Sequence, residues 1–175
     1  MPLQESKLER FQEQRCTSSK VRNGTLLSTG QWAMWSRDEP KPTWSEEFGG
    51  IWTTPFYVCQ IDAMLFGPCT DTAKFADLQK RRGMFQFDGC YYDAELIEKA
   101  LWGLTADTVR VGTLRRSGIH SVVDGADKDL RIVGPDWVVL VAPYRPDSIG
   151  SFKITDLPVM KEETEDEAGS RGMSQ

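Results

Sequence analysis

Two side chains have the types that a thiol-based active site needs. Cys90 could supply the nucleophile, and His120, the single histidine of the chain, could supply its base. Such a pair works only when both side chains lie within hydrogen-bonding reach and a third group orients the histidine. His120 lies in the alternating segment 118–122, where a partly exposed position on a strand is the simpler interpretation. Because the common nucleotide-binding and hydrolase signatures are absent from the sequence, it favours a non-catalytic protein.

The sequence also lacks the spacing of a metal site. Four cysteines are scattered along the chain without a C-x-x-C pair: Cys16, Cys59, Cys69 and Cys90. Together with one histidine they do not form the ligand pattern of structural zinc, and free cysteine packs as a small hydrophobic residue. The acidic run 124–129 lacks the central glycine and the terminal glutamate of an EF-hand, so it predicts a polar hairpin tip. We therefore expect reduced cysteines, no metal and no cofactor.

The basic run 80–82 is explained by a helix end. Segment 72–82 has Asp71 as a possible N-cap and Gly83 just beyond its end, and cations in a last turn complement the helix dipole. The net charge of -5 argues against a surface built entirely for nucleic acid. Five of the 26 acidic residues lie at 162–167, however, and the rest of the chain is near neutral. This leaves room for a local basic face.

Tryptophan is abundant, with six residues in the chain. Trp32 and Trp35 alternate to opposite sides of an expected strand, so one core face cannot bury every indole ring. Exposed tryptophan is enriched at binding surfaces. The alternative to ordinary core packing is a partner-binding surface that contains Trp35, Trp44 and Trp52.

Length and composition predict one folded domain. The chain has 175 residues, of which 39% are hydrophobic. We expect an N-terminal helix or arm at 1–20, a single domain at 21–159 and a disordered acidic tail at 160–175. The longest apolar run, 137–142, has the length of a strand and falls well short of the roughly 20 residues that span a bilayer. With no apolar leader at the first residues, the expected location is the cytoplasm.

Hydrophobic periodicity predicts an α+β fold. Leu96, Ile97, Ala100, Leu101 and Leu104 recur on one stripe of a helix that Asp93 would cap. Strands follow that helix too closely for further helices to separate them. We expect an antiparallel or mixed sheet with two or three helices packed on one face. The other expected elements are a hairpin at 21–36, helices at 3–15, 60–66 and 72–82, and strands at 84–87, 108–114, 119–123, 130–133 and 137–142.

Four segments in the second half of the chain form a distinctive series: FQFDGCYYDAELIEKALWGL at 85–104, DTVRV at 107–111, DLRI at 129–132 and WVVLVAPYR at 137–145. Together they resemble a domain of the bacterial DNA polymerase sliding clamp. In that family a phenylalanine-bearing strand leads into a tyrosine-led helix rich in leucine and alanine, and a valine-arginine strand follows. The family's final strand ends in methionine-proline-methionine-arginine, for which this chain has Ala142-Pro143-Tyr144-Arg145.

The resemblance implies a clamp-like fold and a non-catalytic role in DNA replication. A clamp-related processivity factor would assemble into a ring, work with replication proteins and touch duplex DNA through Lys80, Arg81, Arg82 and Arg110. The alternative is a small accessory or inhibitory module, of viral or host origin, that binds a protein partner through its tryptophan-bearing loops. Size in solution separates the two hypotheses, since a closed ring requires an oligomer.

Overall fold

The computed structural model describes residues 17–28, 31–37, 61–79, 82–101, 103–115 and 124–160. Several predictions lie outside these residues: the helix at 3–15, the strand at 119–123, the tail beyond 160, and the side chains of Lys80, Arg81, Trp44, Trp52 and His120.

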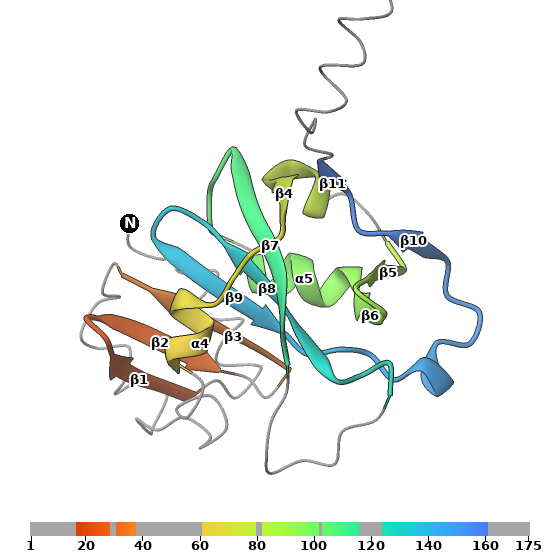
Figure 1. Ribbon diagram of the computed structural model, residues 1–175, viewed down its shortest axis with the longest axis horizontal. Coiled ribbons are helices and arrows are strands. Elements are labelled where there is room, and N and C mark those ends of the chain that lie inside the picture. Colours follow the sequence, from red (N-terminus) through yellow and green to blue (C-terminus); the bar gives the residue numbers. More distant parts are fainter. Residues whose placement is uncertain are drawn as a thin grey trace, which may run out of the picture.

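The larger sheet has eight strands in the order β1-β2-β3-β9-β8-β7-β4-β11 (Figure 1). All its neighbouring strands are antiparallel. The strands are β1 (Thr17–Val21), β2 (Gly24–Ser28), β3 (Trp32–Ser36), β4 (Asp71–Lys74), β7 (Thr108–Arg115), β8 (Lys128–Val133), β9 (Trp137–Val141) and β11 (Val159–Met160). The expected hairpin at 21–36 is confirmed as β2 paired with β3. The strand β1 begins at Thr17, within the segment 1–20 that the sequence assigned to an N-terminal helix or arm.

A second, three-stranded sheet lies beside the larger one, in the order β10-β5-β6. It combines β5 (Met84–Phe87) and β6 (Cys90–Asp93), joined by the predicted turn at Asp88 and Gly89, with β10 (Ile154–Asp156). β10 runs parallel to β5, so the fold is mixed as well as antiparallel. The strand β6 was not expected from the sequence, because its residues directly precede a helix and look like the start of it.

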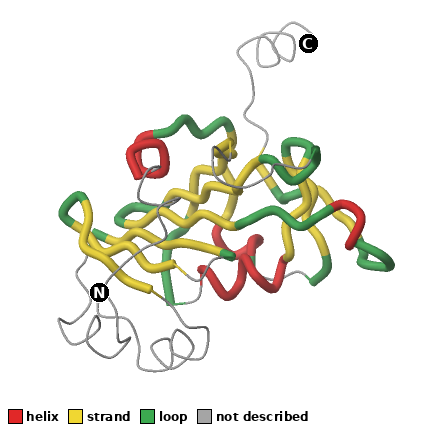
Figure 2. Tube along the Cα trace, turned by 90° about the horizontal axis from the view of Figure 1, so that it is seen from below, coloured by secondary structure: helices red, strands yellow, loops and turns green. Residues whose placement is uncertain are grey.

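Among the described residues, two α-helices cover opposite faces of the larger sheet (Figure 2). They are α4 (Ile61–Phe66) and α5 (Ala94–Leu101). Trp137, Val139 and Val141 of β9 pack in the same cluster as α5, while Val138 and Leu140 pack with Met64 of α4. The α+β class is therefore confirmed, but the prediction that the helices lie on one face is wrong. A central strand that is apolar at every position must be covered on both sides.

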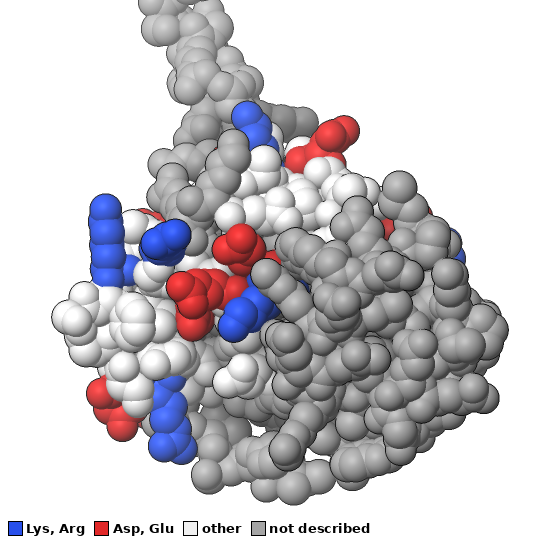
Figure 3. Space-filling model, turned by 180° about the vertical axis from the view of Figure 1, so that it is seen from behind, with Lys and Arg blue, Asp and Glu red and all other residues white. Residues whose placement is uncertain are grey.

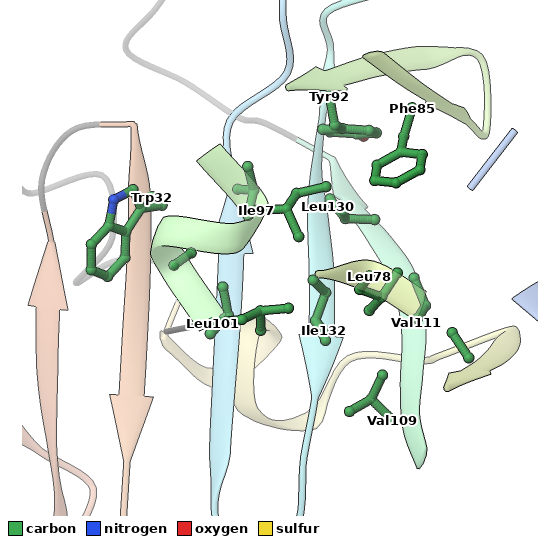
Figure 4. Close-up of a cluster of buried hydrophobic side chains, with 14 of the residues drawn as sticks. Trp32, Leu78, Phe85, Tyr92, Ile97, Leu101, Val109, Val111, Leu130 and Ile132 are labelled. Carbon is green, nitrogen blue, oxygen red and sulfur yellow. The ribbon is translucent and has the colours of Figure 1, made fainter. Parts of the chain in front are cut away.

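The predicted helix is confirmed as α5, although it ends at Leu101 and the stripe residues Leu96 and Leu104 are only partly buried. Ile97, Ala100 and Leu101 are fully buried, and the Asp93 carboxylate accepts a hydrogen bond from the backbone N–H of Glu95 at 2.9 Å. In Figure 4 the side chains of Ile97 and Leu101 lie beside those of Leu130 and Ile132 on β8. The helix thus lies across the sheet, as its periodicity indicated.

The helix predicted at 72–82 is wrong. Asp71–Lys74 forms the strand β4, which pairs with β7 on one side and with β11 on the other. Phe75–Leu78 then makes a single 3₁₀ turn that buries Phe75 and Leu78. Pairing with β7 outweighed the local helix signals, because cross-strand partners are invisible to propensity.

Candidate functional site

Cys90 is a buried core residue. Its side chain is fully buried, and its thiol donates to the Oδ1 atom of Asp127 at 3.5 Å. Burial raises the pKa of the Cys90 thiol, which keeps it protonated and unreactive. His120 lies outside the described residues, so the structure does not test the expected Cys90–His120 pair.

The acidic run at 124–129 does not form a metal site in the described part of the chain. Asp124 is exposed and Asp127 is half-buried, whereas Asp129 is fully buried on β8. No group of three or more histidine, cysteine or acidic side chains among the described residues could hold a metal ion. The burial of Asp129 was not expected from its place in a polar turn.

The residues expected to contact DNA do not form a described basic surface. Arg82 and Arg110 are exposed, and Arg110 donates from Nη2 to the backbone carbonyl of Cys69 at 3.1 Å. The exposed positions of α5 carry Glu95, Glu98 and Lys99. On the α5 side of the molecule, seen in Figure 3, the described acidic and basic side chains are interspersed. Among the described side chains of this face, positive charge is therefore not concentrated as it is at phosphate-binding surfaces.

The described residues do form a cleft on the opposite side of the sheet, next to α4. We call it the Phe66 cleft, and its volume is about 420 Å³. Its walls come from the β1–β2 turn, β3, the end of α4 and the β8–β9 turn, and they include Arg22, Trp35, Arg37, Phe66, Pro135 and Val138. A cavity of this size falls within the range of ordinary ligand sites.

Trp35 lies in the wall of this cleft but is not the exposed residue that the sequence suggested. Only 7% of it is exposed, and it packs with Leu26, Leu140 and Met64. Gly24, two residues from the cross-strand partner of Trp35, makes room for the ring, because a Cβ there would lie 2.5 Å from the indole Cε2 atom. Most of the tryptophan ring therefore serves packing, and its remaining surface faces the cleft.

Phe66 is the exposed aromatic residue of the cleft. It is the last residue of α4, and 78% of it is exposed. It is the most exposed of the large apolar side chains that the structure describes. The sequence hypothesis of an aromatic binding surface named three tryptophans and missed Phe66, which lies just before Gly67 and Pro68 at a helix end.

A buried arginine holds the end of α4 in place. Arg131, on β8, donates from Nε to the Met64 carbonyl at 2.6 Å, from Nη2 to Leu65 at 3.0 Å and from Nη1 to Gly67 at 2.7 Å. The last carbonyls of a helix have no partner within the helix, so the guanidinium group serves as its C-terminal cap. Burial lowers the pKa of Arg131 below its ordinary value. Sequence reasoning missed this role, although a charged residue inside the apolar strand LRIV was a usable signal.

An ion pair joins α4 to the β1–β2 turn. Arg22 donates from Nε and Nη2 to the two carboxylate oxygens of Asp62, each at 3.1 Å. Arg22 and Asn23 have φ of 50° and 60°, as in a two-residue type I′ hairpin turn.

No protein-family model, no curated protein and no solved structure matches this chain. The sliding-clamp resemblance and the function it implies therefore stay predictions, and the cleft is interpreted from its own geometry. None of the helices in the described ranges has the length and apolar character needed to cross a membrane.

Proposed function

We propose that this chain is a non-catalytic interaction module that binds a peptide segment of a partner protein in the Phe66 cleft. The observation that carries the proposal is the position of Phe66, 78% exposed at the edge of a 420 Å³ cleft on a helix end that Arg131 fixes. Aromatic residues on a preorganised support dominate the binding energy of many protein interfaces.

The chemistry of the cleft supports binding rather than catalysis. Its walls combine apolar side chains such as Leu65, Val133 and Val138 with two arginines. Its described wall residues include one carboxylate, Asp136, but no cysteine, histidine, serine or lysine that could act as a nucleophile beside it. Apolar walls with a few charged groups suit the side chains of a bound peptide.

A direct test is selection from a phage-displayed peptide library on the immobilised protein. We expect the enriched peptides to lose at least about tenfold in affinity when Phe66→Ala is introduced, since a central aromatic contact is commonly worth that much. Phe152→Ala is the matched control, because Phe152 is 50% exposed but lies against Tyr144, away from the cleft. No enrichment, or equal losses in both variants, would contradict the proposal.

The second candidate is the DNA replication role implied by the sliding-clamp resemblance. Arg82 and Arg110 are exposed and available to phosphates. If this role holds, replacing Lys80, Arg81 and Arg82 with alanine should weaken binding to a 40-base-pair duplex and reduce its salt dependence. A ring would also require an oligomer in solution. The absence of duplex binding by the unmodified chain at low salt would remove this candidate.

A further inference from the structure

The two arginines of the Phe66 cleft differ in their pairing. Arg22 is held by both carboxylate oxygens of Asp62. Arg37 is exposed, and within the described ranges no carboxylate lies within ion-pair distance of its guanidinium group. The backbone of Arg37 is nevertheless fixed, because its N–H donates to the Asp136 carbonyl at 2.9 Å. The guanidinium group of Arg37 therefore has hydrogen-bond donors that no described carboxylate accepts, and its backbone is held in place.

Those donors lie in the same cleft as an uncovered apolar surface. Phe66 is mostly exposed, and Leu65, Val133 and Pro135 line the cleft with it. An apolar side chain of a ligand would remove this surface from water, at a gain of about 25 cal/mol for each Å² buried. A carboxylate of the same ligand could accept two parallel hydrogen bonds from one guanidinium group.

We infer that the ligand of the cleft is an acidic peptide segment, in which an aspartate or glutamate stands within a few residues of a large hydrophobic side chain. This inference rests on the proposed peptide-binding function and specifies its ligand. Arg37 binds the carboxylate, and Phe66 covers the hydrophobic side chain. A neutral segment would leave Arg37 without a partner and gain only the apolar contact.

Two of the described carboxylates lower the affinity of the cleft for an acidic ligand. Asp62 already pairs with Arg22, so the Arg22 guanidinium group is not available to a carboxylate of the ligand. Asp136 lines the cleft, and its exposed carboxylate repels a ligand of like charge. Replacing either residue by its amide should therefore strengthen binding, and Asp62→Asn should have the larger effect because it releases the Arg22 guanidinium group.

The inference is tested on the library-selected peptide with the highest affinity, compared with the same peptide in which every Asp and Glu is replaced by Asn and Gln. We expect the amide peptide to bind about tenfold more weakly to the full chain, as for the loss of a partly exposed charge pair. Arg37→Gln should weaken the acidic peptide by a similar factor and leave the amide peptide unchanged. Asp62→Asn should tighten the acidic peptide alone.

Arg145→Gln is the control, since Arg145 is exposed but does not line the cleft. The difference between the two peptides should shrink when NaCl is raised from about 50 to 500 mM, because salt screens exposed charges. Equal affinities of the acidic and amide peptides, with binding still dependent on Phe66, would overturn the acidic ligand and leave the peptide-binding function standing. Insensitivity of every selected peptide to Phe66→Ala would instead overturn the function itself.

Discussion

Replacing Arg131 with methionine should weaken the attachment of α4 to the sheet. Methionine keeps much of the length of the arginine side chain but donates no hydrogen bonds. The carbonyls of Met64, Leu65 and Gly67 would lose their shared partner. A buried carbonyl left without a partner costs about 1–3 kcal/mol, and three of them set an upper range of about 3–9 kcal/mol.

The net effect should be smaller than this range, for two reasons. The variant no longer has to bury a guanidinium charge, which in a folded protein costs several kcal/mol. Water can also reach some of the freed carbonyls, because Gly67 is half-buried and Phe66 is exposed. We therefore expect Arg131→Met to lower the free energy of unfolding by about 2–4 kcal/mol.

Urea unfolding followed by tryptophan fluorescence measures this change, provided that the m-value stays constant. The matched control is Arg110→Met on the neighbouring strand β7, where an exposed arginine makes one hydrogen bond to the Cys69 carbonyl. Its effect should stay below about 1 kcal/mol. Hydrogen exchange should also show faster exchange in α4 of the Arg131 variant. Equal midpoint shifts in the two variants, or unchanged exchange in α4, would refute the capping role.

Three further predictions concern the core and its surroundings. Leu101→Ala should cost about 2–5 kcal/mol in urea unfolding, since Leu101 is fully buried, whereas Glu98→Ala on the exposed side of α5 should cost almost nothing; similar costs would contradict the helix-on-sheet packing. A hydrogen bond from Thr113 lowers the pKa of Asp88, so this carboxylate stabilises the fold above its ordinary pKa and stops doing so as the pH falls through the lowered value. In Asp88→Asn the melting temperature should therefore fall less steeply as the pH is lowered. The stability that this carboxylate contributes is less than about 1 kcal/mol, because the side chain is half-exposed. An unchanged acid slope would refute this. Cys90 should resist iodoacetamide in the native protein and react only in denaturant, since burial raises its pKa; rapid native alkylation mapped to it by mass spectrometry would reopen the question of a thiol active site.

The sequence predicted elements whose residues carry their own periodic signal. The stripe that includes Ile97 and Leu101 predicted α5, and the apolar run at 137–142 predicted β9. Both are confirmed, because the spacing of the apolar residues within each element shows which of its positions are buried. The position of the two helices was not predictable in the same way. A fully apolar strand reveals that both faces are covered but does not say which helix covers each face.

The prediction of a helix at 72–82 was wrong for a related reason. The helix signals of this segment were local, whereas the pairing of Ala73 with Val109 and Val159 joins distant parts of the chain. The Phe66 cleft is also non-local, because Arg22, Phe66 and Pro135 come from three separate turns and helix ends. No spacing rule connects these residues, and only the strand order of the sheet brings them into one wall.

The pairing of β3 with β9 has a consequence for how the chain folds. Ser36 lies opposite Trp137, so most of the chain separates two strands that share the centre of the sheet. The first three strands can form as local hairpins early, but β3 keeps an open hydrogen-bonding edge until β9 has been synthesised. Contacts between residues so far apart in sequence close slowly, because the entropy of a long loop must be lost before the contact is gained. During translation, the strands β1 to β3 should therefore form an incomplete sheet with an open edge. This edge is prone to aggregation until the last third of the chain has been synthesised and β9 can pair with β3.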